Sequence, residues 1–267
     1  MIKMKHNGIY YEKISSQNPK GTLILLPGLT GNIEKYSNYV NNLKKDYNFV
    51  LFDLIGHGNS DFPNNLKSFS IENQAKIITQ ILKKERVPKS TIISHSYSLN
   101  IALEIINQNP NKFKSLIMIS PFSLECNQKA KKKAKYVKLF LPFWKFFPHI
   151  RKSISKEEWK KIDEGSFLDN KLRIKEIGIK SYFAHINSCL KSNSLSKIKK
   201  ITLPSLIICK EDDPLSTQEI LKTLEQKIPK LKIQKIQGNG HRIFKHDQEE
   251  VLKKIKSFLR HCPVGHS

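Results

Sequence analysis

The sequence predicts an α/β protein with a mostly parallel central sheet and helices on both of its faces. Short apolar runs that suit buried strands alternate with amphipathic stretches that suit helices. This alternation occupies the first 120 residues, stops, and resumes after residue 196, and the 267 residues are enough for one large core. We therefore expect a core domain of residues 1–120 and 197–267 and an inserted segment at 121–196.

Each expected element follows from its pattern. The strands of the first half are expected at Gly8–Ile14, Thr22–Leu26, Asn48–Asp53, Ser90–Ser94 and Lys114–Ile119. Helical spacing of apolar residues marks Ile33–Lys45, Ile71–Glu85 and a segment that begins at Leu99. After the insertion we expect strand Ser205–Cys209, helix Thr217–Lys227, strand Leu231–Ile236 and helix Glu249–Arg260.

The chain is strongly basic, with 47 Lys or Arg against 23 Asp or Glu and a formal net charge of +24. Such a charge raises nucleic acid as a partner. Only five of the cations are arginine, the residue that makes most bidentate contacts with bases and phosphates. The lysine excess therefore indicates a compositional bias, and we expect no specific nucleic-acid partner.

The four cysteines, Cys126, Cys189, Cys209 and Cys262, lack the pairwise spacing of a metal site and form no dense framework. We expect reduced thiols and no metal. Residues 1–14 lack the apolar stretch of a signal peptide, and no run reaches the roughly 18 apolar residues of a membrane span. These observations favour a cytoplasmic location.

One serine stands where a strand turns into a helix. An apolar run from Thr91 is followed by Ser94-His95-Ser96-Tyr97-Ser98 and then by the helix from Leu99. A serine hydroxyl attacks well only when a turn exposes it, a base takes its proton and helix N-terminal amides receive the oxyanion. The alternative is that Ser96 only caps the helix.

An acid and a histidine follow in chain order. The apolar run Ser205–Cys209 leads to Asp213, directly before a proline, and the next strand leads to His241 in a glycine-rich loop. Glu211 and Asp212 are alternatives to Asp213. Serine, aspartate and histidine thus each follow a predicted strand.

In this order of motifs the chain resembles the α/β-hydrolase superfamily. Leu25–Gly31 is similar to the family's oxyanion loop, with Pro-Gly where His-Gly is usual, and Phe52–Asp61 is similar to its Asp-x-Arg-Gly-His-Gly-x-Ser stretch, with Ile55 for arginine. The resemblance spans about residues 8–260.

The resemblance implies a serine hydrolase that needs no cofactor. Ser96 would be the nucleophile, His241 the base and Asp213 its partner, with the backbone N–H groups of Leu29 and Tyr97 as the oxyanion hole. Serine argues against relatives that attack with aspartate, such as epoxide hydrolases and haloalkane dehalogenases. The expected substrate is a small to medium hydrophobic ester or thioester, with amide, lactone or carbon–carbon bond hydrolysis as alternatives.

The chain departs from the family at its elbow, where Ser94 and Ser98 replace the glycines of Gly-x-Ser-x-Gly. A Cβ at either place risks a clash that would disturb the turn. The alternative class of function is therefore an inactive family member that binds a ligand or a partner. His95, His57 and Asp53 lie within the motifs, and we expect structural roles for them.

The insertion, which the resemblance implies to be a helical cap, is basic and aromatic. Residues 121–200 carry 20 Lys or Arg and 7 Asp or Glu. The stretch Tyr136–Phe147, flanked by Lys131–Lys133 and by Arg151-Lys152, has two interpretations. Its aromatic residues line an acyl pocket or pack onto the core, or they contact an anionic membrane surface.

Overall fold

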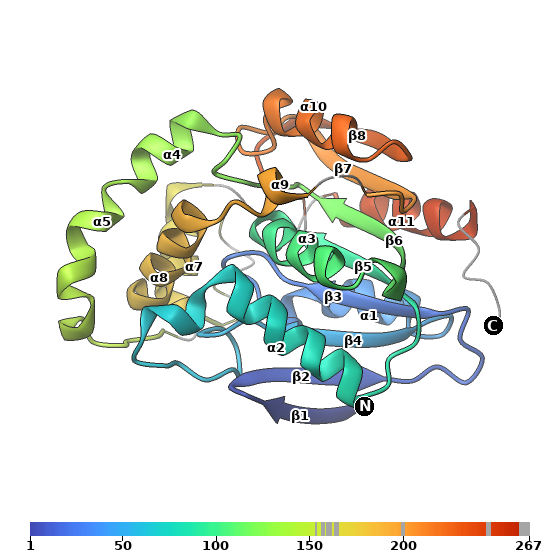
Figure 1. Ribbon diagram of the computed structural model, residues 1–267, viewed down its shortest axis with the longest axis horizontal. Coiled ribbons are helices and arrows are strands. Elements are labelled where there is room, and N and C mark those ends of the chain that lie inside the picture. Colours follow the sequence, from blue (N-terminus) through green and yellow to red (C-terminus); the bar gives the residue numbers. More distant parts are fainter. Residues whose placement is uncertain are drawn as a thin grey trace.

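A computed structural model describes all residues except 153, 156–157, 159–161, 163–165, 199–200, 244–246 and 262–267. Its centre is one sheet in the order β1-β2-β4-β3-β5-β6-β7-β8 (Figure 1). The pairs β1–β2 and β2–β4 are antiparallel, and every other pair is parallel. The predicted mostly parallel sheet is confirmed.

The strands are β1 (Ile2–His6), β2 (Ile9–Ile14), β3 (Thr22–Leu26), β4 (Asn48–Asp53), β5 (Ser90–His95), β6 (Phe113–Ile119), β7 (Ser205–Asp212) and β8 (Leu231–Asn239). All residues of β3 are buried, as are all but the first of β4. Because side chains alternate along a strand, Ile24 and Leu26 pack on one face of the sheet while Leu23 and Leu25 pack on the other. Both faces of the sheet are therefore covered.

Helices cover the two faces. The face that receives Ile24 is covered by α2 (Ile71–Lys84), α3 (Leu99–Gln108) and α10 (Gln218–Lys227), whose apolar stripes join its core. The other face is covered by α1 (Ser37–Leu43) and α11 (Gln248–His261). The short 3₁₀ helices of the core are η1 (Ile33–Tyr36), η2 (Leu66–Phe69), η3 (Ser96–Ser98) and η4 (Pro110–Lys112).

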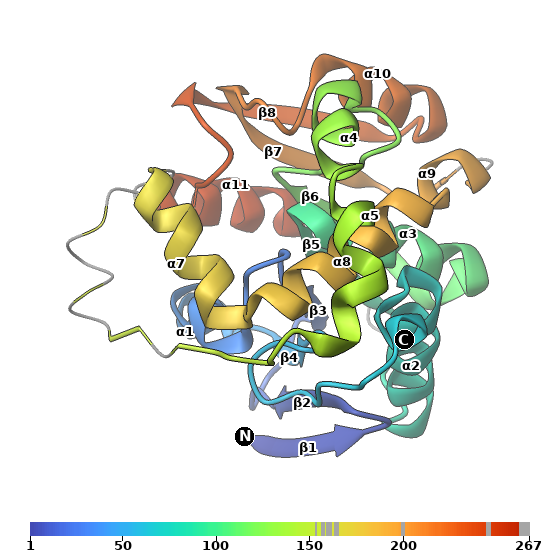
Figure 2. The ribbon, with the colours of Figure 1, turned by 90° about the vertical axis from the view of Figure 1, so that its left-hand side faces the viewer.

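Helices also occur among the described residues between β6 and β7. They are α4 (Gln128–Ala134), α5 (Val137–Phe140), η5 (Leu141–Phe146), α7 (Phe167–Ile177), α8 (Ile179–Lys191) and α9 (Ser194–Lys197). Figure 1 and Figure 2 show α4, α5, α7 and α8 beyond the ends of the strands, where the arrow of β6 points. We call residues 121–196 the cap segment. The described residues of the expected insertion are thus largely helical, and α9 spans its expected end.

Three details differ from the expectations. Strand β1 was not predicted, because its lysines and single apolar residues give no buried pattern. It is an edge strand with no buried residue: three of its five residues are exposed and two are partly exposed. The helix expected at Ile33–Lys45 is divided into η1 and α1. Strands β7 and β8 each run three residues beyond the predicted ends. Within the described part of the chain, no helix is long and apolar enough to cross a bilayer.

Candidate active site

The turn between β5 and α3 holds Ser96 in a strained conformation. Its φ is +51°, in the left-handed region that side chains other than glycine rarely adopt. Strand β5 ends at His95, and η3 begins at Ser96 itself. The N–H of Tyr97 lies in the first turn of this helix, where amides have no intrahelical acceptor. The turn therefore presents one hydroxyl next to helix N-terminal amides.

The two serines that replace the expected glycines are accommodated by hydrogen bonds. Ser98 Oγ donates to the carbonyl of Leu26, at 2.8 Å, and accepts from the N–H of His95, at 3.0 Å. Ser94 Oγ lies 3.5 Å from the carbonyl of Ile117. Ser98 has an ordinary helical φ of −71°. Both hydroxyls are buried, so the added atoms link the turn to the neighbouring strands β3 and β6.

Ser96, His241 and Asp213 form a continuous chain of hydrogen bonds. Ser96 Oγ lies 2.7 Å from Nε2 of His241. The other ring nitrogen of His241, Nδ1, lies 2.9 and 3.0 Å from the two carboxylate oxygens of Asp213. The structure thus brings together three side chains that the sequence separates by up to 145 positions.

The extended ends of β7 and β8 explain this meeting. Asp212 pairs with Asn239 across the two strands, and the N–H of Gly240 donates to the carbonyl of Asp212 at 3.1 Å. Asp213 and His241 come directly after this pairing. Glu211 and Asp212 are exposed, whereas Asp213 is buried, so Asp213 is the carboxylate that faces His241.

The local environment keeps Asp213 ionised. Burial raises the pKa of this carboxyl, but hydrogen bonds from His241 and from the backbone N–H groups of Ser216 and Leu215 outweigh it, so the pKa lies below its ordinary value. Asp213 Oδ1 accepts those two backbone N–H groups at 3.0 and 2.8 Å. A fixed anion of this kind orients the imidazole and stabilises its protonated form.

The loop that carries Leu29 is held by buried side chains. The hydroxyl of Tyr36 accepts a hydrogen bond from the N–H of Gly28, at 3.0 Å, and lies 2.8 Å from Nδ1 of His95. His57 Nε2 donates to the carbonyl of Leu29. These contacts fix the backbone of the loop beside Ser96, where the resemblance places an oxyanion donor.

Asp53, His57 and His95 each bond to structural partners. Asp53 accepts the N–H groups of Ile33 and Asn59, both at 2.8 Å, and burial raises its pKa to about 6. Burial lowers the pKa of His57 to about 4. Burial also lowers the pKa of His95, whose ring stacks against that of His241 with 6.2 Å between centroids. None of these three side chains lies between Ser96 and His241.

A pocket of about 490 Å³ opens at Ser96 and His241. Its lining includes Leu29 and Tyr97, the two residues expected to supply oxyanion donors. Apolar residues from the core and the cap segment form one wall: Phe122, Leu124, Ala130, Ala134, Val137, Ile174, Ile186 and Leu215. The space suits a small substrate with an apolar portion.

The same pocket contains cations that the sequence analysis did not single out. Lys35, Lys133, Arg173 and Arg242 line it, and none of its described lining residues is Asp or Glu. Arg173 of α7 and Arg242 both bond to the carboxylate of Asp169, which is 2 % exposed. Two of only five arginines therefore lie at this site. Because arginine is scarce in this lysine-rich chain, the positions of the arginines were the sequence feature that could have pointed to the pocket.

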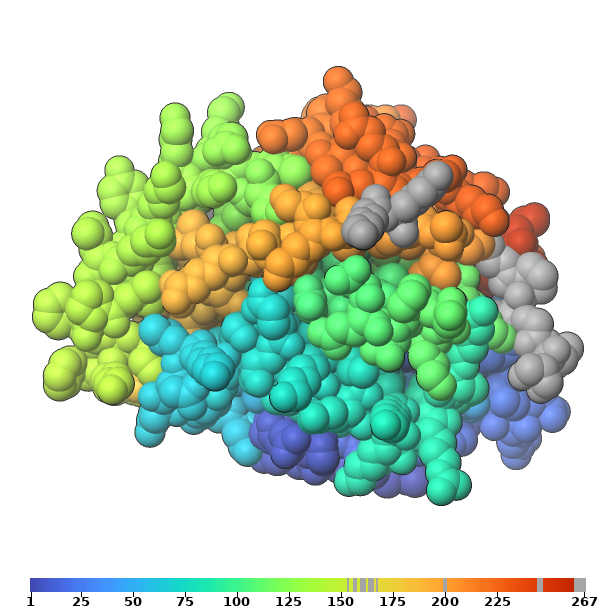
Figure 3. Space-filling view, viewed as in Figure 1, coloured from blue at the N-terminus to red at the C-terminus, as the bar shows by residue number. Residues whose placement is uncertain are grey.

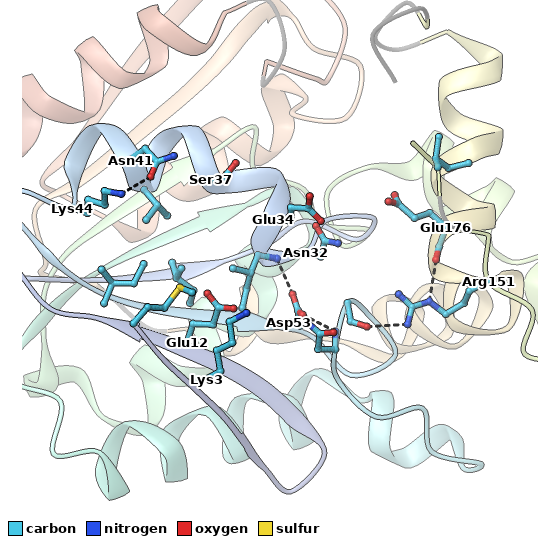
Figure 4. Close-up of a pocket in the computed structure, with 18 of the residues that line it drawn as sticks. Lys3, Glu12, Asn32, Glu34, Ser37, Asn41, Lys44, Asp53, Arg151 and Glu176 are labelled. Carbon is cyan, nitrogen blue, oxygen red and sulfur yellow. Dashed lines mark hydrogen bonds between the residues drawn. The ribbon is translucent and has the colours of Figure 1, made fainter. Parts of the chain in front are cut away.

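A second hollow has a volume of about 1120 Å³, and Figure 4 shows residues that line it. Its described lining carries both signs of charge, including Lys3, Glu12 and Arg151, and does not include Ser96 or His241. Asp53 faces it, with its carboxylate occupied by backbone N–H groups. Glu176 lines this hollow and bonds to Lys35 of the first pocket, so the ion pair stands between the two.

Metal-ligating side chains and thiols are the other groups that could carry chemistry. Within the described residues, no group of three or more His, Cys, Asp or Glu could hold a metal ion. Cys126, Cys189 and Cys209 are buried free thiols, and Cys262 lies outside the described residues. Burial raises the pKa of Cys209 to about 11, so this thiol stays protonated and is a weak nucleophile at neutral pH.

The fold and this site define a member of the α/β-hydrolase class. Residues 21–157, half of the chain, match the alpha/beta hydrolase fold family, and the protein belongs to that family. An uncharacterized hydrolase of Bacillus subtilis is 22 % identical over 94 % of each chain. A putative 2-succinyl-6-hydroxy-2,4-cyclohexadiene-1-carboxylate synthase of the same organism is 21 % identical over 95 % of this chain and 96 % of its own.

Solved structures share the fold. An epoxide hydrolase from Bacillus megaterium superposes with a TM-score of 0.75 at 18 % identity, over 97 % of this chain and all of its own. A carboxylesterase structure from Nitrososphaera gargenis gives a TM-score of 0.75 at 17 % identity over 98 % of both chains. At these identities the likeness concerns the architecture, and the chemistry must be argued from the side chains.

Proposed function

We propose that the protein is a serine hydrolase that cleaves small to medium hydrophobic esters or thioesters through an acyl-enzyme. The observation that carries this proposal is the 2.7 Å contact between Ser96 Oγ and His241 Nε2, at a turn where Ser96 has a φ of +51°. Ionised Asp213 behind the imidazole and the apolar wall of the pocket support it.

Each residue has a defined step. His241 Nε2 takes the hydroxyl proton as Ser96 Oγ attacks the carbonyl carbon, and Asp213 stabilises the imidazolium that forms. The N–H groups of Leu29 and Tyr97 would receive the oxyanion; one such donor contributes about 3 kcal/mol to transition-state stabilisation. His241 then passes the proton to the leaving alcohol or thiol. Water, activated by the same imidazole, releases the acid and restores Ser96.

A fluorophosphonate probe tests the nucleophile without knowledge of the substrate. We expect the wild-type protein to be labelled on Ser96 and to cleave 4-nitrophenyl esters of short and medium acyl chains. Ser96→Ala should lose labelling and at least about a thousandfold of the esterase rate. Ser94→Ala, next but one in the same turn, is the matched control and should still be labelled. Absence of wild-type labelling would support an inactive, ligand-binding member instead.

A second candidate function has the same site act on a substrate that carries a carboxylate. The cations Lys35, Arg173 and Arg242 favour it, because they line the pocket of Ser96. A relative with a carboxylate in its named product is consistent with this candidate. Guanidinium groups recognise carboxylates in a bidentate manner. In such a substrate the bond cleaved is an ester or thioester, or the carbon–carbon bond named among the alternatives.

Paired substrates separate the two candidates. The mono-4-nitrophenyl ester of glutaric acid and 4-nitrophenyl pentanoate have similar length but differ in charge. The first candidate predicts equal or better cleavage of the neutral ester. The second predicts preference for the acid, reduced about tenfold in Arg173→Gln and unchanged in Lys175→Gln, an exposed cation on the same helix.

A further inference from the structure

The cap segment carries a concentrated apolar patch on its outer surface. Six of the ten exposed large apolar side chains in the described residues come from one stretch of fifteen positions. They are Tyr136, Leu139, Phe140, Phe143, Phe146 and Ile150, which are 67, 68, 46, 61, 84 and 70 % exposed. We call these six residues the apolar cap patch. A contiguous exposed apolar surface of this kind marks a site of interaction with another protein, a membrane or a ligand.

The exposure of the patch follows from how its segment is anchored. Trp144 is only 2 % exposed, and its Nε1 donates to the carbonyl of Lys180 in α8 at 2.9 Å. The ring of Phe140 also stacks on Phe183 of α8, with 5.6 Å between centroids. With Trp144 directed inward, its neighbours Phe143 and Phe146 are left on the outer side. The aromatic residues of this stretch therefore do not all pack onto the core.

The charge around the patch has one sign. Residues 128–152 contain nine Lys or Arg and no Asp or Glu. The exposed cations among them are Lys129, Lys132, Lys133, Lys135, Lys138, Lys145, Arg151 and Lys152. Lysine side chains can extend toward anionic headgroups while adjacent aromatic residues enter the interface. A second copy of the chain would instead bring two such cationic surfaces together.

Pocket residues and patch residues lie close together along the chain in this part of the cap segment, and the short helix α5 contributes Val137 to the pocket and Leu139 to the patch. Ala130, Ala134 and Val137 line the pocket of Ser96, whereas Tyr136 and Leu139 are exposed. Figure 2 shows α4 and α5 on the near side of the molecule, with α5 in front of α8, and Figure 3 shows the same segment at the edge of the molecule. A surface that bound the patch would lie one helix away from the pocket.

We propose that the apolar cap patch and its surrounding lysines dock the protein on an anionic lipid bilayer. The proposal combines two independent requirements. The apolar side chains need an apolar medium, and the cations need negative charge at its boundary. A bilayer with anionic headgroups supplies both over a wide area. Docking of this kind does not depend on the reaction proposed above, because it uses side chains outside the Ser96–His241–Asp213 arrangement.

Vesicle sedimentation with the full chain tests the proposal. The vesicles are phosphatidylcholine alone, or phosphatidylcholine with about one third phosphatidylglycerol, at an ionic strength of about 0.15 M. We expect binding to the anionic vesicles and none to the neutral ones. Each cation near such a surface contributes about fivefold to partitioning. The triple variant Lys132→Gln, Lys135→Gln, Lys138→Gln should therefore bind about a hundredfold more weakly.

A charge-matched variant separates docking from general attraction of a basic protein. Lys76→Gln, Lys83→Gln, Lys84→Gln removes three exposed lysines from α2 and should bind like the wild type. The variant Phe143→Ser, Phe146→Ser keeps every charge and should lose at least about tenfold. Circular dichroism checks that each variant is folded.

A tryptophan at Phe146 gives a direct readout of insertion. In Phe146→Trp we expect the emission to shift to the blue on anionic vesicles and to be quenched by brominated acyl chains. Three results would each overturn the proposal. They are equal loss of binding in the α2 and cap variants, no binding of the wild type, and Phe146→Trp emission that brominated lipid leaves unchanged. So would sedimentation velocity that shows a dimer abolished by the Phe143→Ser, Phe146→Ser changes, since the patch would then be a self-association surface.

Discussion

Replacing Asp213 by asparagine tests the proposed chemistry closely, because the side chain keeps its shape while one acceptor becomes a donor. In the structure Asp213 Oδ1 accepts the N–H groups of Leu215 and Ser216 at 2.8 and 3.0 Å. The amide oxygen of the variant should therefore stay at that position. Its NH₂ group then occupies the place of Oδ2, which is 3.0 Å from Nδ1 of His241.

The substitution should change the tautomer of His241. A proton on Nδ1 would meet the new NH₂ group at 3.0 Å, donor against donor, and the neutral amide oxygen at 2.9 Å is a weaker acceptor than the carboxylate it replaces, so a proton on Nε2 is favoured. Nε2 then donates to Ser96 Oγ and cannot accept its proton. In serine triads the wrong tautomer lowers kcat about 10⁴-fold, which corresponds to about 5 kcal/mol in the activation free energy.

The assay is hydrolysis of a 4-nitrophenyl ester together with the rate of fluorophosphonate labelling. Asp212→Asn is the matched control, because Asp212 is the adjacent exposed carboxylate, and its rate should change by no more than about twofold. A folded Asp213→Asn protein that kept more than about a tenth of the wild-type rate would refute the reasoning, since a 10⁴-fold effect is expected. So would a larger loss in Asp212→Asn than in Asp213→Asn.

Three other predictions follow from buried contacts. Ser98→Ala should lower the free energy of unfolding by about 1–3 kcal/mol in urea titrations, because the N–H of His95 loses its acceptor and the carbonyl of Leu26 loses a donor; an unchanged midpoint would contradict this. Gly28→Ala should reduce kcat/KM at least about tenfold, since its Cβ would lie 2.6 Å from Nδ1 of His95, and full activity would show that the loop can shift. Burial lowers the pKa of His57 from 6.5 to about 4. As the pH falls, His57 therefore becomes protonated in the unfolded chain before it does in the folded protein, and the free energy of unfolding should drop by about 2 kcal/mol between pH 7 and 5. A urea midpoint that stays constant over this range would exclude this contribution of His57.

Local sequence patterns were enough to predict most of the elements and to identify the candidate residues. Buried strands such as β3 and β4 have continuous apolar runs, and the stripe of α2 repeats at helical spacing, so local patterns suffice for them. Ser96, Asp213 and His241 were identified because each lies in the loop that follows a predicted strand. Strand β1 escaped prediction because an exposed edge strand needs no apolar pattern.

Which side chains meet depends on the packing of segments that are distant in the chain. The extra residues of β7 and β8 turn Asp213, and not Asp212, toward His241. Asp169 draws Arg173 and Arg242 together from positions far apart in the chain, which no local pattern encodes. The burial of Trp144 likewise leaves Phe143 and Phe146 exposed. Periodicity tells whether a residue has a buried side, but pairing between distant segments decides what that side contacts.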